Sequence, residues 1–376
     1  MKTILLVEDD PAVRRGIKEN LEREHFRVLV EQDGAKGLRR ARKDTPDLII
    51  LDVMLPGLNG FDICARLKKE GCPAPVFMLT GLADERARLR GLEMGADQYI
   101  PKPFSLEELL LRVKNSFEQT DRMLGKARSL ERELLKAREI QKNALPSRAP
   151  KVPGLDIFGT MIPATHVGGD YFDYLPIGNG LFGTVVADVS GKGMPAALYV
   201  HKMQGIVQST RASVRHASDL LGHLQEFLGT SMEASSFVTA AAAVFDIQGR
   251  TVDIASAGHP PVLLKSGNRL YEVDASGMII GPAGATVFQD LVKPTTLNVR
   301  PGDVLMFYSD GVLEAMNTEQ EEFGMDRLKN SFLHAERSAR AVAARCLRDV
   351  RNFIGDEPQS DDTTIVVVQI NTGETA

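Results

Sequence analysis

The chain has 376 residues, enough for two or three domains, and its 43% hydrophobic and 25% charged residues are typical of globular proteins. A net charge of -5 gives no electrostatic case for nucleic acid, so we expect no nucleic-acid partner. The three cysteines form no Cys-x-x-Cys pair, which argues against a zinc site or a disulfide framework.

The start of the sequence and its apolar runs argue against export and membrane insertion. Met1 and Lys2 lead directly into an apolar run, which leaves no room for a signal peptide. No apolar run approaches the ~20 residues that a membrane-spanning helix needs. We therefore expect a cytoplasmic protein with reduced thiols and no membrane partner.

Residues 1 to about 104 alternate short apolar runs with amphipathic stretches. The runs are continuously apolar, as in strands that are buried on both faces. This alternation predicts an α/β fold with a doubly wound, five-stranded parallel sheet. The expected strands are Thr3–Val7, Arg27–Val30, Leu48–Leu51, Val76–Leu79 and Gln98–Ile100, and the expected helices are Ala12–Glu24, Gly34–Asp44, Gly60–Glu70 and Asp84–Met94.

A long helix is predicted next, because a capping box at Ser105-Leu106-Glu107-Glu108 is followed by no proline before Pro146. Apolar and small residues then recur with four-three spacing, which predicts a coiled-coil seam and a homodimer. An ordinary surface helix packed on its own domain is the alternative. The seam consists of Met123, Ala127, Leu130, Leu134, Ala137, Gln141 and Ala144, and prolines at 146, 150 and 153 form a stiff connector after it.

Residues 154 to about 370 contain strand-like runs in succession, interrupted by a few long helices, which predicts layered sheets covered by helices. Gln248-Gly249-Arg250 is typical of a hairpin turn. The expected strands are Thr184–Val189, Phe237–Phe245, Thr251–Ala257, Val262–Lys265, Val304–Tyr308 and Thr364–Ile370, and the expected helices are Pro195–Ser213, Ala217–Thr230, Asp326–Ala335 and Ser338–Gly355.

Acidic residues follow several of the apolar runs. In the first segment, Glu8-Asp9 and Asp52 come at the carboxyl ends of predicted parallel strands, where such sheets bind ligands. Thr80 ends the next strand and Lys102 follows the last. Such a pocket suits Mg²⁺ and an acyl phosphate, since metal and lysine neutralise phosphoryl oxygens while Asp52 attacks phosphorus. A strand-end aspartate taken alone is more often a cap or turn residue.

Residues 1 to about 120 resemble the receiver domain of two-component response regulators. The similar motifs are Leu6-Val7-Glu8-Asp9-Asp10, Asp52-Val53-Met54-Leu55-Pro56-Gly57, Leu79-Thr80-Gly81 and Tyr99-Ile100-Pro101-Lys102-Pro103-Phe104. The resemblance implies that Asp52 is the phosphoacceptor of a cognate histidine kinase. It also implies Mg²⁺ ligands from Glu8, Asp9 and the Met54 carbonyl, phosphoryl contacts from Thr80 and Lys102, and an aromatic switch at Tyr99.

A second group of acids lies further along the chain, and glycines stand beside several of them. It comprises Gly168-Gly169-Asp170, Asp188-Val189-Ser190-Gly191-Lys192-Gly193, Asp310-Gly311 and Ser360-Asp361-Asp362-Thr363. Glycine lets a backbone carbonyl or a water approach a metal closely. Two divalent ions ~4 Å apart, joined by a carboxylate, produce hydroxide for phosphomonoester hydrolysis. Gly191-Lys192-Gly193 lacks full P-loop spacing, and Gly168-Gly169-Asp170 alone is more often a turn.

Together these motifs, with Ser256-Ala257-Gly258-His259-Pro260, resemble PPM-type metal-dependent Ser/Thr phosphatases of the SpoIIE-like branch, of which the preceding Ile140-Gln141 and Leu145-Pro146 are also typical. The family fold is two packed sheets flanked by helices. The resemblance implies two Mn²⁺ or Mg²⁺ ions bridged by Asp188, beside the Val189 carbonyl. Asp310 and Asp361 would complete one metal and Asp170 the other. Gly169 and Asp362 are less certain members of the site, and no residue for substrate phosphate is evident.

The expected domains are a receiver at 1–120, a helical coiled-coil linker and connector at 121–153, and an α/β layered β-sandwich phosphatase at 154–372. The resemblance implies that phosphorylation of Asp52 controls the phosphatase. It further implies a phosphorylated STAS-type anti-sigma-factor antagonist as substrate, in partner-switching stress signalling. The alternative is a non-enzymatic receiver-adaptor whose phosphatase-like domain only binds a sigma-pathway protein. That domain would be expected to lack some metal-binding acids, whereas Asp170, Asp188, Asp310 and Asp361 are all present.

Overall fold

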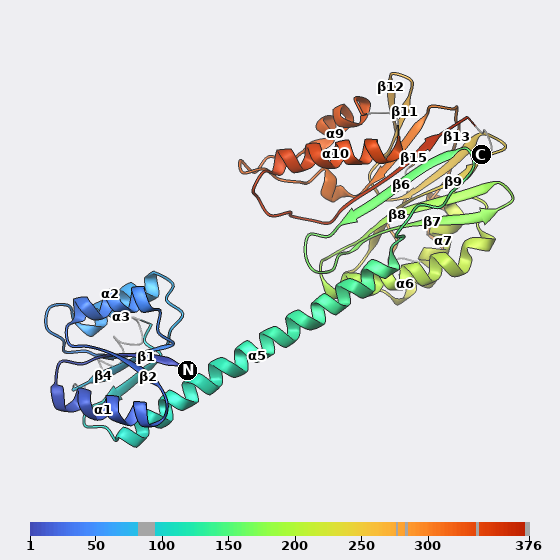
Figure 1. Cartoon of the computed structure of the whole chain (residues 1–376). Helices are drawn as coiled ribbons and strands as arrows, with labels where there is room; N and C mark the ends of the chain where they lie inside the picture. The colour runs from blue at the N-terminus through green and yellow to red at the C-terminus, as the bar shows by residue number, and fades with distance from the viewer. Residues whose placement is uncertain (82–94, 276, 283–284, 336–337, 373–376) are drawn as a thin grey trace. The chain divides into compact units, whose positions relative to one another are not determined.

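The structure, a computed structural model, describes residues 1–81, 95–275, 277–282, 285–335 and 338–372, with the side chains of Ala127, Ala285 and Thr286 left out. The chain divides into two compact units, Met1–Ser129 and Leu130–Ala376 (Figure 1). Among the described residues, no helix is both long enough and apolar enough to span a membrane.

The first unit contains a parallel five-stranded sheet with the strand order β2-β1-β3-β4-β5. The chain adds β2 on one side of β1 and then β3, β4 and β5 in succession on the other side, which confirms the doubly wound sheet. The five expected strands are present. The expected helix Asp84–Met94 lies outside the described residues. The elements are β1 (Thr3–Val7), α1 (Pro11–Arg23), β2 (Arg27–Glu31), α2 (Gly34–Asp44), β3 (Leu48–Asp52), α3 (Gly60–Lys69), β4 (Val76–Thr80) and β5 (Gln98–Pro101).

Two apolar clusters cover the two faces of this sheet. On one face, Leu38 of α2 and Ile63 of α3 pack against the strands. On the other, Ile17 of α1 packs with Leu109 and Val113, which belong to the helix α5 (Leu106–Ala144). The first turns of α5 therefore complete the core of the first unit, because they cover a sheet face that would otherwise be open to water.

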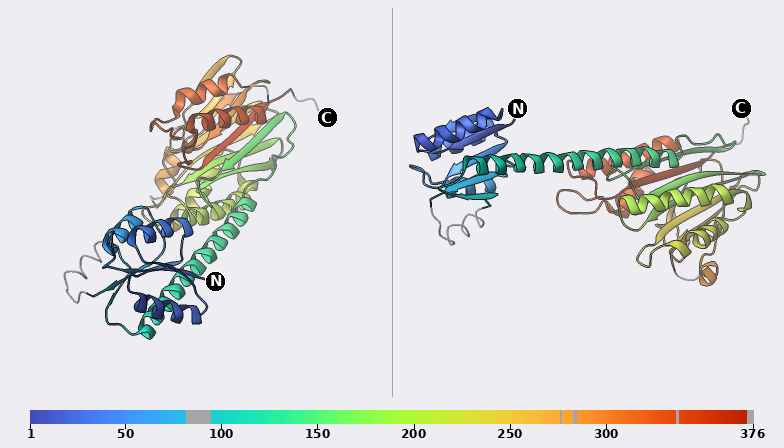
Figure 2. Two further views of the ribbon diagram at one scale, coloured as in Figure 1. Left: turned by 60° about the vertical axis from the view of Figure 1, so that its left-hand side comes forward. Right: turned by 90° about the horizontal axis from the view of Figure 1, so that it is seen from below.

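Helix α5 has 39 residues and is drawn as one unbroken helix in Figure 2. Of the expected seam, Met123 and Leu130 are exposed, by 62% and 59%. Gln141 and Ala144 are instead buried in the second unit, at 3% and 4% exposure. The seam prediction is therefore wrong for these two residues, because the end of α5 packs on its own chain and a second copy could not reach them.

The second unit contains two five-stranded sheets, ordered β13-β10-β9-β8-β7 and β12-β11-β14-β15-β6. The first comprises β7 (Asp170–Gly178), β8 (Leu181–Val189), β9 (Val238–Asp246), β10 (Thr251–Ala257) and β13 (Thr295–Asn298). The second comprises β6 (Leu155–Ile162), β11 (Val262–Ser266), β12 (Arg269–Val273), β14 (Val304–Tyr308) and β15 (Thr363–Ile370). All pairings within both sheets are antiparallel.

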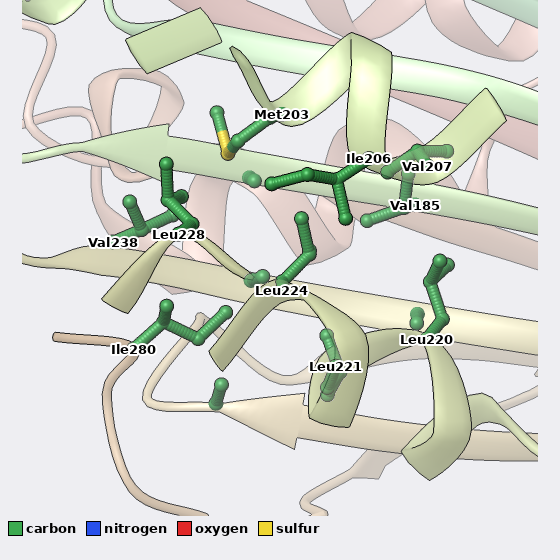
Figure 3. Close-up of a cluster of buried hydrophobic side chains, with 14 of the residues drawn as sticks. Val185, Met203, Ile206, Val207, Leu220, Leu221, Leu224, Leu228, Val238 and Ile280 are labelled. Atoms are coloured by element: carbon green, nitrogen blue, oxygen red, sulfur yellow. The ribbon is translucent and has the colours of Figure 1, made fainter. Parts of the chain in front are cut away.

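The two sheets pack face to face through one apolar cluster that draws residues from both. Helices cover the outer face of each sheet, which gives four layers and confirms the α/β layered sandwich. The first sheet carries α6 (Met194–Thr210), α7 (Ala217–Phe227) and α8 (Ala285–Leu291), and the second carries α9 (Gly324–Leu333) and α10 (Ala339–Ile354). Figure 3 shows Met203 and Ile206 of α6 meeting Leu220 and Leu224 of α7 over the first sheet.

Several elements of the second unit were not expected from sequence. Strands β6 and β7 lie in a stretch that had no assigned structure, and β12, β13 and α8 were also missed. Strand β7 interleaves its apolar residues with Asp170 and Asp173, which are both buried. Buried acids interrupt the apolar pattern from which strands are predicted. Strand β7, which carries the site residue Asp170, could therefore not be recognised from the pattern.

Candidate functional sites

The receiver residues converge at the carboxyl ends of neighbouring parallel strands. Glu8 follows β1, Asp52 ends β3 and Thr80 ends β4, and all three are buried. Lys102 follows β5, and its Nζ lies 2.8 Å from Glu8 Oε2 and 2.8 Å from Asp52 Oδ2. Asp9 is exposed at the rim.

One carboxylate oxygen from each of Glu8, Asp9 and Asp52 lies within 4.8 Å of the other two. In the part of the chain that the structure describes, this is the only such group of three potential ligands. Burial and the neighbouring Asp52 charge raise the pKa of Glu8 to about 7, although Lys102 opposes the shift. Three hard oxygen donors held this closely fit a Mg²⁺ ion. The ion would neutralise the negative charge of the carboxylates that Lys102 does not balance.

Met54 and Tyr99 occupy different settings beside this pocket. The Met54 side chain is 67% exposed, and its backbone N–H lies 3.3 Å from Asp52 Oδ1. The Tyr99 ring stacks on Phe61 with centroids 6.3 Å apart. Its hydroxyl is buried without a hydrogen-bond partner among the described residues, and burial raises its pKa to about 12. A buried hydroxyl without a hydrogen-bond partner is unfavourable by ~1–3 kcal/mol, so a rotamer that exposes the Tyr99 hydroxyl to water would recover that free energy.

In the second unit, acids from both sheets meet at one end of the sandwich. Asp170 begins β7 and faces Asp188 of β8 directly in the antiparallel register. Asp310 begins the short helix η3 (Asp310–Val312) just after β14, and Asp361 precedes β15 in the other sheet. The charges of Asp170, Asp310 and Asp361 all act on Asp188, which places the four carboxylates in one electrostatic site.

Among the described residues, little positive charge lies close enough to Asp188 and Asp170 to offset their burial and the neighbouring acids. Burial and the neighbouring acids raise the pKa of Asp188 to about 9. Burial raises the pKa of Asp170 to about 7, although the Thr364 hydroxyl, 2.6 Å from Asp170 Oδ2, opposes the shift. Lys192 Nζ lies 2.9 Å from Oδ2 of the rim residue Asp361 and 2.7 Å from the Ser360 carbonyl oxygen, and its side chain is half-exposed. Carboxylate oxygens are hard donors, so a divalent cation would suit these acids by replacing their protons, although no three of them reach the 4.8 Å spacing that the described receiver acids have.

Asp362 lies behind the site and holds the loop that leads into β7. Its Oδ1 accepts a hydrogen bond from the Ala164 N–H at 2.8 Å, and its Oδ2 accepts one from the Gly169 N–H at 2.7 Å. A Cβ on Gly168 would collide with the same carboxylate. Gly169 likewise has no room for a side chain, since a Cβ there would lie 2.8 Å from the Val189 carbonyl oxygen.

Sequence reasoning missed three polar residues around this site. Thr364 supports Asp170, and Lys192 pairs with Asp361. Gln141 contacts the backbone of Gly168. The sequence feature that could have pointed to Lys192 is its position four residues after Asp188. Gln141 carried two signals, because it belongs to a motif typical of the SpoIIE-like branch and its four-three spacing also matched the apolar seam of α5.

Comparison with known proteins places both units in families. Residues 4–114 match the response regulator receiver domain, and residues 178–371 match stage II sporulation protein E (SpoIIE). The response regulator MprA of Mycobacterium leprae is 40% identical over 117 residues, which are 31% of this chain and 51% of that protein. This chain therefore spans about half the length of that relative.

Two solved structures share the fold of the second unit. The SiaA-PP2C domain of Pseudomonas aeruginosa aligns with a TM-score of 0.57 and 20% identity, over 65% of this chain and 98% of that one. A Mycobacterium tuberculosis structure of RsbU and RsbW domains aligns with a TM-score of 0.50 and 23% identity, over 62% and 64%. The chain belongs to the SpoIIE family of PP2C-type phosphatases and carries a response-regulator receiver domain before its phosphatase domain.

Proposed function

We propose that this protein is a metal-dependent serine/threonine phosphatase controlled by phosphorylation of Asp52. The observation that carries the proposal is the convergence of four aspartates from two sheets on a site that lacks matching positive charge. A site built only for binding a protein would gain nothing from burying Asp170 and raising the pKa of Asp188. We assign the receiver to residues 1–120, the linker to 121–153 and the phosphatase to 154–372.

In the phosphatase site we assign two Mg²⁺ or Mn²⁺ ions to Asp188 as the shared ligand, with the Val189 carbonyl beside it. Asp170 serves one ion, and Asp310 with Asp361 serves the other. When bound, such ions neutralise phosphoryl oxygens and supply a water-derived nucleophile at neutral pH. A metal ion bound by Asp361 would take the place of the Lys192 ammonium beside that carboxylate, and the half-exposed Lys192 would then lose this ion pair.

Asp362 and Gly169 are assigned to the support of this site. Both oxygens of Asp362 already accept backbone N–H groups of the loop before β7. Gly169 brings its backbone against the Val189 carbonyl. These contacts support a role in orienting Asp170 and Val189, without a direct bond to metal.

In the receiver we assign Mg²⁺ to Glu8, Asp9, Asp52 and the Met54 carbonyl. Asp52 takes the phosphoryl group from a cognate histidine kinase. Its Oδ2 already lies 2.8 Å from Lys102, which is therefore placed to bind a phosphoryl oxygen.

Two further receiver residues respond to the phosphoryl group. Thr80 ends the strand next to the one that carries Asp52, which supports a contact between its hydroxyl and the group. Tyr99 changes rotamer on activation, and its unpaired buried hydroxyl supports that role.

For the substrate we propose a phosphorylated STAS-type anti-sigma-factor antagonist. The likeness to the structure of RsbU and RsbW domains, over 62% of this chain and 64% of that one, supports this class. A receiver-adaptor would bind the same partner without removing its phosphate. The two functions are separated by whether serine phosphate is lost.

Replacement of Asp188 by Asn should lower Mn²⁺-dependent hydrolysis of p-nitrophenyl phosphate by at least ~100-fold, because a shared ligand for the metal ions is lost. The control is Asp173→Asn, which changes another buried acid of β7 and should keep most activity. Full activity in Asp188→Asn, with a circular dichroism spectrum like wild type, would contradict the site.

Metal binding should release protons near neutral pH. Metal-free Asp188 and Asp170 have pKa values of about 9 and about 7, so both carry protons that a cation must displace. Mn²⁺ affinity should therefore rise with pH. The metal-free fold should lose stability as pH rises from about 4 to 9, because the folded state holds more protons than the unfolded state there. Calorimetry in buffers of different ionisation enthalpy measures the release, and none at pH ~7 would contradict these pKa shifts.

A small phosphodonor such as acetyl phosphate should change the phosphatase rate of wild type. Asp52→Ala should show no such response, because it lacks the carboxylate that accepts the phosphoryl group, yet it should keep its basal rate. The rate is followed with p-nitrophenyl phosphate and Mn²⁺. An equal response in both proteins would show that the phosphodonor acts elsewhere.

A phosphorylated STAS-domain antagonist should lose its serine phosphate when incubated with wild type and Mn²⁺, and should keep it with Asp188→Asn. Intact-protein mass spectrometry measures the loss. Binding of the antagonist by both proteins without any loss of phosphate would support the adaptor and refute the phosphatase.

The exposed part of the α5 seam should form a homodimer. Replacing Met123 and Leu130 together by Glu places charges in that seam and should give a monomer at micromolar concentration in analytical ultracentrifugation. Ser129→Glu adds the same kind of charge at an exposed position off the seam and should stay dimeric. A monomeric wild type, with and without phosphodonor, would refute dimerisation through α5.

A further inference from the structure

Gln141 is a buried polar residue on a helix stretch that is otherwise largely exposed. Its neighbours Ile140 and Lys142 are exposed, whereas Gln141 is only 3% exposed. Its side-chain Nε2 donates to the Gly168 carbonyl at 2.6 Å, and its Oε1 accepts from the Gly168 N–H at 2.9 Å. One amide thus satisfies both backbone groups of a single residue.

Gly168 stands at the start of the loop that delivers Asp170. Gln141 holds this loop from the α5 side, and Asp362 holds it from the β15 side through the Gly169 N–H at 2.7 Å. Asp362 Oδ2 also lies 3.4 Å from the Asp170 N–H. Two side chains, Gln141 and Asp362, therefore hold the backbone that leads to Asp170.

We infer that Gln141 is a positioning residue for metal binding, acting through the Gly168 backbone on Asp170. This inference rests on the proposed metal-dependent function. Loss of the amide leaves two buried backbone groups without partners, and the loop shifts to satisfy them. Asp170 then no longer faces Asp188 in the register that a shared cation requires.

The same helix gives the positioning role a regulatory consequence. Leu109 and Val113 of α5 are buried in the core of the first unit, and Gln141 is buried in the second. No break separates them, since α5 runs as a single helix from Leu106 to Ala144. A rotation of α5 about its axis would act directly on Gln141 and, through its two hydrogen bonds, on the Gly168 backbone.

The chain offers a matched control in Gln225. Its amide donates to the Gly281 carbonyl at 2.8 Å and accepts from the Gly281 N–H at 3.0 Å, and Gln225 is also 3% exposed. Gly281 has no acidic neighbour in sequence. A purely structural role for a buried glutamine predicts the same consequences at both positions.

The test measures Mn²⁺ binding by calorimetry in the full-length chain, with Asp9→Asn present throughout to disable the receiver carboxylates. Gln141→Met keeps side-chain length and removes both hydrogen bonds, and it should weaken binding at the phosphatase site at least tenfold. Gln225→Met should leave that affinity within twofold of the parent, although both variants should lower the melting temperature without metal. Hydrogen exchange should also accelerate at Val167–Asp170 in Gln141→Met alone.

The outcomes separate the inference from the proposed function. Parent-like Mn²⁺ affinity in Gln141→Met, or equal weakening in Gln225→Met, overturns the positioning role and leaves the phosphatase assignment standing. A parent chain that binds no Mn²⁺ in a manner sensitive to Asp188→Asn overturns the proposed function itself.

Discussion

Carboxylates buried beside one another cannot all stay ionised without a cation, and both acidic sites of this chain are built under that constraint. In the receiver, Lys102 contacts Glu8 and Asp52 and supplies part of the charge from within the fold. In the phosphatase site, Asp188 has no such contact among the described residues, and its pKa rises to about 9. The first group of acids therefore has a cation from within the fold, whereas Asp188 would need protons or a bound cation to balance its charge.

The surroundings of the phosphatase acids follow from the same constraint. Acids that repel one another must be held in place if they are to share a cation, and side chains and backbone around them provide that support. Asp362 binds the loop before β7, glycines bring the chains close, and Gln141 ties that loop to α5. Through α5 the loop before Asp170 is joined covalently to the core of the first unit, and under the proposed function this helix would connect phosphorylation at Asp52 to Asp170.

Much of this could be predicted from sequence, because buried parallel strands have an unbroken apolar pattern and their terminal acids mark the receiver pocket. The phosphatase family could be predicted from motifs around Asp188 and Asp310. Strand β7 could not, since Asp170 and Asp173 interrupt its pattern. Gln141 was misassigned because the spacing that fits a coiled-coil seam also fits a helix packed on its own domain. Only tertiary contacts distinguish the two.

The most direct test of this account is anomalous diffraction at the manganese edge from crystals grown with Mn²⁺. The account predicts two peaks beside Asp188, with Asp170 and Asp310 near them and with Asp361 turned away from Lys192 toward a metal. A peak only beside Glu8 and Asp9 of the receiver, with the Lys192–Asp361 pair intact and no metal at Asp188, would contradict it.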